Sequence, residues 1–313
     1  MKRFVFKTFV FYAIILFLIV IAISFINSIS RQNSNFKTKQ KSSYAVFGNS
    51  HPECAFNDSL IDDLTNLASS GEAYFYTYFK AKNIIENNKD IHTVFIEFSY
   101  TGINKASDEW IWTDKYLSKR FDEYGPFMTF KDYHVLFSHN RQGFIKYLTY
   151  STKKNLKRIL SNQQHFEDEI GGYRFLDKEL ADSTKKNFLE SKPIKVEKFT
   201  LSNTNKKYLL KTVNYFKGSG VKVYFIKSPT YNYTIRTTVE VFLQDILNTK
   251  FKHVELLDFS KFPLEASDFF DNGHLNYKGA KKFSIWFDSL LKKGFLDLPS
   301  KQVFIDRHIE LMK

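Results

Sequence analysis

The chain has 313 residues, of which 43% are hydrophobic and 18% aromatic. This composition is sufficient for one large packed domain, and it excludes a disordered or low-complexity protein. The formal net charge is +13. Because lysine far outnumbers arginine and the lysines are scattered, we attribute this charge to compositional bias and expect no nucleic-acid partner. Anionic lipid or an acidic cell-wall polymer remains the alternative explanation of the charge.

The N-terminal segment is predicted to be a membrane anchor. Lys2, Arg3 and Lys7 precede an uncharged, mostly apolar run from Thr8 to Ile26, and about 20 apolar residues are needed to cross a bilayer as a helix. A cleaved signal peptide would have a shorter apolar stretch and a small-residue cleavage site. We therefore predict an uncleaved signal anchor over residues 1–27.

The residues after the anchor are polar and are predicted to form a tether over residues 28–43. Basic residues flank the anchor on both sides, so their distribution does not decide the topology. An N-terminal anchor followed by an exported domain is the usual arrangement, and the family resemblance given below leads us to adopt it, with a single-pass anchor and the folded domain outside the cytoplasm.

An α/β domain is predicted over residues 44–296. Short β-branched or aromatic runs indicate buried strands, and helical spacing of apolar residues indicates helices between them. The expected strands are Tyr44–Phe47, Asn66–Ala68, Thr93–Phe98, Val221–Ile226 and Val254–Leu257, and the expected helices are Ala73–Asn87, Asn205–Lys217, Thr238–Leu247 and Lys278–Leu291. This alternation predicts a three-layer sandwich with a flavodoxin-like parallel sheet.

Residues from about 104 to 200 interrupt the alternation and are predicted to be a mostly helical insertion between strands 3 and 4. Insertions at the carboxyl ends of strands lie over the ligand crevice of open α/β sheets. We expect a cap or a substrate-binding wall, and a decorative insertion without a role in binding is the alternative. Residues 297–313 are assigned to a C-terminal tail.

The first candidate for chemistry lies where the first strand ends. Residues 46–51 read Val-Phe-Gly-Asn-Ser-His, which puts Ser50 at a tight turn, and Pro52 suits the first turn of a following helix. A serine at such a turn can expose its hydroxyl, and its own N–H can help to stabilise an oxyanion. Taken alone the signal is weak, because a serine in this position can simply cap a helix.

The second candidate lies near the other end of the domain. Residues 271–279 read Asp-Asn-Gly-His-Leu-Asn-Tyr-Lys-Gly, immediately before a predicted helix. One loop could then supply His274 as a base for the Ser50 hydroxyl and Asp271 as the group that fixes the imidazole. The alternative is a surface loop with an incidental aspartate and histidine.

Together the two motifs resemble those of the SGNH/GDSL hydrolase superfamily, in which a serine follows the first strand and Asp-x-x-His precedes the last helix. The second motif most resembles that of membrane-anchored members acting in alginate acetylation and in D-alanylation of teichoic acid. The specific motifs occupy only about twenty residues, although the outline covers most of the soluble chain. The resemblance implies a serine hydrolase or acyltransferase with Ser50, Asp271 and His274 as its triad.

The sequence departs from the superfamily pattern in its other motifs. Asn49 replaces the aspartate of the usual Gly-Asp-Ser, and there is no Gly-x-Asn-Asp. For the oxyanion hole, the resemblance implies the N–H of Ser50, a glycine for which Gly71 is the best positional match, and an asparagine for which Asn104 is a guess. His51 and Ser228 are expected to line the pocket. We expect no metal and no cofactor.

The function we expect is a membrane-anchored serine esterase or O-acyltransferase that acts on a cell-envelope or extracellular polysaccharide through an acyl-serine. A membrane-bound acyltransferase is a further expected partner. The alternative is a non-catalytic glycan-binding or accessory subunit of a membrane acyl-export complex, with a vestigial triad. The sequence does not choose between hydrolysis and transfer, which use the same three residues.

Overall fold

The computed structural model describes residues 1–163, 170–180, 199–231 and 237–312. The chain divides into two compact units. One contains Met1–Phe36 and Trp112–Glu169, and the other contains Lys37–Ile111 and Ile170–Lys313. The second unit carries the sheet and both motifs singled out in the sequence.

The second unit is built on a five-stranded parallel sheet in the order β2-β1-β3-β4-β5, the flavodoxin-like order. The strands are β1 Tyr44–Phe47, β2 Leu64–Asn66, β3 Thr93–Glu97, β4 Lys222–Lys227 and β5 Glu255–Asp258. The predicted α/β class and parallel sheet are confirmed. Because parallel strands all end at one edge, the loops after β1, β3 and β4 lie at the same side of the sheet.

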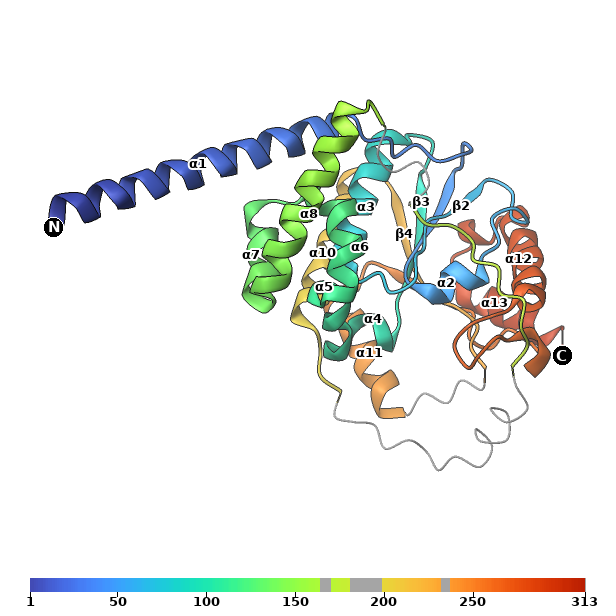
Figure 1. The fold of residues 1–313 in the computed structure, drawn as a ribbon. Helices are drawn as coiled ribbons and strands as arrows, with labels where there is room; N and C mark the ends of the chain where they lie inside the picture. Colours follow the sequence, from blue (N-terminus) through green and yellow to red (C-terminus); the bar gives the residue numbers. More distant parts are fainter. Residues whose placement is uncertain (164–169, 181–198, 232–236, 313) are drawn as a thin grey trace. The chain divides into compact units, whose positions relative to one another are not determined.

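Helices cover both faces of this sheet (Figure 1). Against one face lie α3 (Tyr74–Asn87), α10 (Asn203–Gly218) and α11 (Thr237–Lys250), and against the other lie α12 (Tyr277–Lys292) and α13 (Lys301–Glu310). The alternation of strand side chains explains the two layers. On the face covered by α3, α10 and α11, Phe47 contacts Phe216 of α10, and Phe225 contacts Phe251, which follows α11. The other face is covered by one large apolar cluster around α12.

Two details of the second unit differ from the sequence expectation. Strand β2 begins at Leu64, two residues earlier than expected, because Leu64 and Thr65 already pair with β1. Residues assigned to a C-terminal tail include α13, whose Ile305 and Ile309 are buried in the core cluster. Apolar residues four apart on one helix face account for this docking.

The predicted insertion is helical in the part that precedes residue 164. It contains η1 (Lys105–Asp108), α5 (Glu109–Trp112), α6 (Asp114–Tyr124), η2 (Gly125–Phe127), α7 (Phe130–His139) and α8 (Arg141–Leu160). Residues 170–180 are irregular, and residues 164–169 and 181–198 lie outside the described residues. The remaining short elements are α2 (Ser50–Ala55), α4 (Tyr100–Ile103), η3 (Ala266–Asp268) and η4 (Phe295–Asp297).

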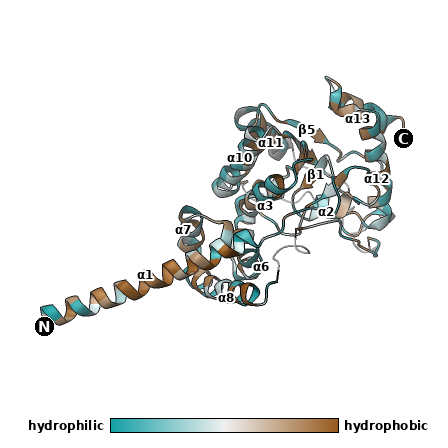
Figure 2. Cartoon of the chain, turned by 90° about the horizontal axis from the view of Figure 1, so that it is seen from above, coloured by the Kyte–Doolittle hydropathy of each residue, from teal (hydrophilic) through white to brown (hydrophobic). Residues whose placement is uncertain are grey.

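The first unit joins the N-terminal helix α1 (Lys2–Gln32) to helices α6, α7 and α8. By length and composition α1 could cross a membrane, and a signal sequence near the N-terminus would pass the same test. Hydrophobic residues occupy most of the length of α1 (Figure 2). Helix α1 continues through the first residues of the predicted tether, and Phe36 beyond it is buried against Phe127, with ring centroids 5.2 Å apart.

Candidate active site

The turn after β1 presents the Ser50 hydroxyl. Asn49, not Ser50, caps helix α2: its side chain accepts a hydrogen bond from the His51 N–H at 3.0 Å. An N-cap side chain satisfies an otherwise unpaired helical N–H. Because Asn49 has this role, the Ser50 hydroxyl is not needed to cap the helix. Gly48 has φ +152°, and a Cβ there would lie 2.6 Å from the Cβ of Glu97. The turn therefore requires glycine, because β1 runs close beside β3 at this point.

The loop before α12 holds an aspartate and a histidine in a fixed relation. The Asp271 carboxylate accepts hydrogen bonds from the backbone N–H groups of Gly273 and His274, at 2.8 and 2.9 Å. The His274 Nδ1 atom lies 2.8 and 2.9 Å from the two Asp271 oxygens. Asn276 caps α12 by accepting from the N–H groups of Lys278 and Gly279. The cap and the carboxylate contacts together orient the imidazole.

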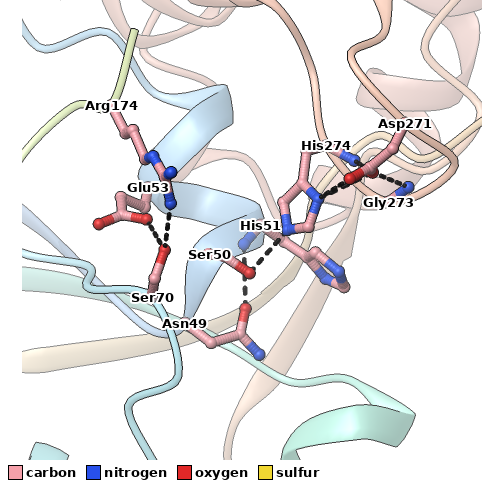
Figure 3. Close-up of polar contacts among 9 residues, drawn as sticks. All are labelled: Asn49, Ser50, His51, Glu53, Ser70, Arg174, Asp271, Gly273 and His274. Carbon is pink, nitrogen blue, oxygen red and sulfur yellow. Dashed lines mark hydrogen bonds and ion pairs between the residues drawn. The ribbon is translucent and has the colours of Figure 1, made fainter. Parts of the chain in front are cut away.

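The two loops meet, although 224 residues separate Ser50 from His274 (Figure 3). The His274 Nε2 atom lies 2.7 Å from the Ser50 Oγ. An ionised carboxylate can only accept hydrogen bonds, so Asp271 assigns the proton to Nδ1 and leaves Nε2 as the acceptor for the serine hydroxyl. This is the arrangement in which an imidazole can take the proton of a nucleophile.

The electrostatics of Asp271 favour its ionised form. Burial acts to raise the pKa of this carboxyl, but the His274 ring and the N–H groups of Gly273 and His274 outweigh it and lower the pKa below the usual aspartate value. The side chain is 46% exposed. Asp271 is therefore charged at neutral pH and can stabilise an imidazolium at His274.

The three oxyanion-hole residues named from the sequence differ in their surroundings. Ser50 is the first residue of α2, where its N–H is one of the unpaired donors of the helix start. Gly71 has φ +64°, and its loop is joined to the serine turn because the Ser69 N–H donates to the Gly48 carbonyl at 3.0 Å. The Asn104 side-chain oxygen accepts from the Ala106 N–H at 3.1 Å.

A second histidine–carboxylate pair, formed by His51 and Glu97, lies beside the first. The His51 Nδ1 lies 3.5 Å from Glu97 Oε1, and the ring centroids of His51 and His274 are 5.3 Å apart. The other Glu97 oxygen accepts from the Ser228 hydroxyl at 2.8 Å. Glu97 is 2% exposed. Its place at the end of β3, next to the end of β4, was the only signal the sequence carried.

His51, Glu97 and Ser228 line a pocket of about 200 Å³. Its lining residues are His51, Glu97, Ser99, Tyr100, Thr101, Lys227, Ser228 and Thr230. His51 and Ser228, the two residues assigned to a pocket from the sequence, are both among these lining residues. Among the described residues, no group of three or more His, Cys, Asp and Glu side chains could hold a metal ion.

The irregular segment 170–180 contacts elements on both sides of the site, and no motif in the sequence predicted these contacts. The Arg174 guanidinium donates to the Ser70 hydroxyl at 3.1 Å, and this hydroxyl in turn donates to Glu53 on α2 (Figure 3). Further along, the Leu176 carbonyl accepts from the Tyr277 N–H at the start of α12. The segment thus contacts both the helix of the serine and the helix that follows the histidine.

The comparisons with known proteins are distant. One protein-family model matches residues 178–296, less than half of the chain, and no curated protein matches. Among solved structures, a provisionally assigned acylhydrolase from Bacteroides fragilis is 10% identical, with 84% of this chain and 94% of that chain covered and a TM-score of 0.36. A provisionally assigned platelet activating factor from Streptococcus pneumoniae is 11% identical, with 91% and 98% covered and a TM-score of 0.33. These similarities are too low to carry an argument about function.

Proposed function

We propose that the chain is a membrane-anchored serine esterase or O-acyltransferase acting on a cell-envelope or extracellular polysaccharide. The single observation that carries the proposal is the 2.7 Å contact between Ser50 Oγ and His274 Nε2, in a histidine already bound to Asp271. A vestigial site in an accessory subunit would have no need to preserve this chain of contacts. The geometry therefore favours the enzyme over the non-catalytic alternative.

In the proposed reaction, Ser50 Oγ attacks an ester or thioester carbonyl while its proton passes to His274 Nε2. The tetrahedral oxyanion would be held by the N–H of Ser50 and, we propose, by that of Gly71. Collapse expels the leaving alcohol or thiol, which takes the proton from Nε2, and leaves an acyl-serine. Water, or a sugar hydroxyl, then gives its proton to Nε2 and attacks the acyl carbon. Collapse of this second tetrahedral intermediate breaks the bond to Ser50 Oγ, which takes the proton back from Nε2, and releases the free acid or the acylated sugar.

The pocket beside His51 is the proposed site of the second reactant. Hydroxyl groups of Ser99, Thr101 and Ser228 and the imidazole of His51 line it, and such groups can bind the hydroxyls of a sugar. Its small volume suits a single ring or an acyl group rather than a long polymer segment. Hydrolysis and transfer differ only in whether this pocket retains water or an acceptor.

The membrane location rests on α1, because no residue of its apolar window is buried. A helix with no polar face and no buried residue over that window has no stable place in water. We propose that α1 is an uncleaved anchor and that the second unit lies outside the cytoplasm, where it meets envelope polymers. A membrane-bound acyltransferase that supplies the acyl group is a proposed partner.

The test is covalent labelling of the full-length chain in detergent with a serine-reactive phosphonate probe, combined with an ester-release assay. Labelling of wild type on Ser50, its loss in Ser50→Ala, and its persistence in Ser70→Ala would support the proposal. Ser70 is the matched control because it also lies near the nucleophile helix but binds Glu53 and Arg174. Equal labelling of wild type and Ser50→Ala, with equal ester release, would remove the enzymatic claim. Ester release without probe labelling would call for mass analysis of Ser50 during turnover.

A further inference from the structure

The first unit contains an apolar groove that the proposed chemistry does not use. It has a volume of about 520 Å³ and lies between the C-terminal half of α1 and helices α7 and α8. Val20 and Ile23 of α1 form one wall, and Phe130 and Phe137 of α7 contribute to the other. Asn27 and Arg31, one and two turns further along α1, line the same groove. It is therefore apolar at one end and polar at the other.

Hydrogen bonds within the first unit fix the walls of this groove. The Tyr133 hydroxyl donates to the Gly125 carbonyl at 2.8 Å and accepts from the Asn27 amide at 3.0 Å, which ties α7 to α1. A capping box between Thr129 and Asp132 fixes the start of α7. The wall of the groove is thus held by hydrogen bonds at both the helix start and the helix crossing.

The position of the groove along α1 matches the boundary of a bilayer. The uncharged run of α1 ends at Ile26, so Val20 and Ile23 lie about 5–9 Å inside that end, at 1.5 Å per residue. Arg31 lies about 8 Å beyond it. Helices that rest in a membrane interface bury their apolar face by about 5–10 Å. If α1 spans a bilayer, α7 is held at this depth.

Helix α7 has the surface expected of an interfacial helix. Phe130, Tyr133, His134 and Phe137 recur at helical spacing and all line the groove. Phe130 is 86% exposed and Phe137 is 37% exposed. Residues 112–163 contain ten lysines and arginines against four aspartates and glutamates, a net charge of +6. An anionic surface is the complement of such a segment.

We propose that this groove binds an anionic phospholipid of the bilayer that α1 crosses. The acyl chain lies along Val20, Ile23 and Phe130, and the phosphate lies near Arg31 and His134. Helix α7 then rests in the membrane interface as a second attachment point beside the anchor. This inference rests on the proposed retention of α1, but it is independent of the proposed reaction at Ser50.

The experiment places a tryptophan at the groove and measures its quenching by brominated lipid. Full-length Phe130→Trp and Leu160→Trp are reconstituted in vesicles, and the emission of the wild type, which contains three tryptophans, is subtracted. Leu160 is the matched control because it is 80% exposed and apolar but is not among the residues lining the groove. We expect the added emission of Phe130→Trp to fall about threefold, and that of Leu160→Trp by less than about 1.2-fold.

The headgroup is tested with vesicles in which either the anionic phosphatidylglycerol or the zwitterionic phosphatidylcholine carries the bromine, at equal mole fraction. Stronger quenching of Phe130→Trp by the anionic lipid, abolished by Arg31→Gln, supports the proposal. Equal quenching by both lipids overturns the anionic site, and equal quenching of the two tryptophan variants overturns the groove. The intact mass of the purified chain shows separately whether α1 is retained, and ester release compared with Ser50→Ala reports on the reaction.

Discussion

Two histidine–carboxylate pairs lie side by side in this site and differ in their hydrogen bonding and in their exposure to solvent. His274 contacts both oxygens of Asp271 within 2.9 Å, and two backbone N–H groups also donate to that carboxylate. His51 lies 3.5 Å from Glu97, beyond a good hydrogen bond, and Ser228 donates to the same carboxylate. Asp271 is about half exposed, whereas the Glu97 side chain is 3% exposed.

These differences in hydrogen bonding and exposure allow the two pairs different roles. A carboxylate that accepts several hydrogen bonds stays ionised. It can fix the tautomer and the orientation of a neighbouring imidazole before that ring takes up a proton. Of the two histidines, His274 is the one that also contacts the Ser50 hydroxyl. The looser His51 pair faces the pocket, where it can bind a substrate hydroxyl without taking part in the attack. The predictions below test this division of roles.

Replacing the two histidines should give the largest contrast. We expect His274→Ala to lower ester turnover by about 10⁴-fold or more, because the serine loses its base. The matched His51→Ala should lower it by less than about 10-fold and act mainly on KM, as expected for uniform binding. Steady-state kinetics with a small ester measures both. Comparable losses in kcat would assign the base role to both rings.

Asp271→Asn should be the next largest effect. An amide at this position can present a donor to Nδ1 and favour the wrong tautomer, so we expect a fall in kcat of about 10³-fold with little change in KM. The paired variant Glu97→Gln should change kcat by less than about 5-fold, because Glu97 touches the pocket and not the nucleophile's base. A larger loss in Glu97→Gln than in Asp271→Asn would reverse the comparison.

Gly48→Ala should disturb the turn after β1, which lies against Glu97. The added Cβ would come within 2.6 Å of the Glu97 Cβ and 2.7 Å of Pro52, and the backbone there is unfavourable for alanine. We expect the free energy of unfolding to fall by about 2–3 kcal/mol. Denaturant titration measures this. Gly218→Ala is the control, because a Cβ there meets nothing within 4 Å.

The smallest expected effect is the pH dependence of Asp271. Its folded pKa is lowered, so its contribution to stability is complete above the usual aspartate pKa of about 3.9 and is lost as the pH falls through the folded value. The difference in melting temperature between wild type and Asp271→Asn should shrink as the pH falls below about 4, where the Asp271 carboxylate becomes protonated. A difference that grows as the pH falls below about 4 would contradict the lowered pKa.

Local patterns in the sequence were enough to predict the sheet and most of its helices. Helix α3 begins one residue after the expected Ala73 and ends at the expected Asn87, because its apolar spacing and turn residues are short-range signals. Strand β2 was misplaced by two residues because the polar Thr65 interrupts the apolar pattern after Leu64, although Thr65 is buried. The proximity of Asp271 to His274 is likewise local, since three residues in one loop separate them.

The surroundings of Ser50, Asp271 and His274 follow from the packing of the whole fold. Glu97, His51 and Ser228 come from three separate strand ends, and parallel pairing of β1, β3 and β4 brings them to one edge. No short-range pattern encodes which side chain there is buried, because burial depends on packing of the whole sheet. The groove beside α7 has the same origin: the sequence determined an apolar helix at the N-terminus, and the fold determined which helices lie against it.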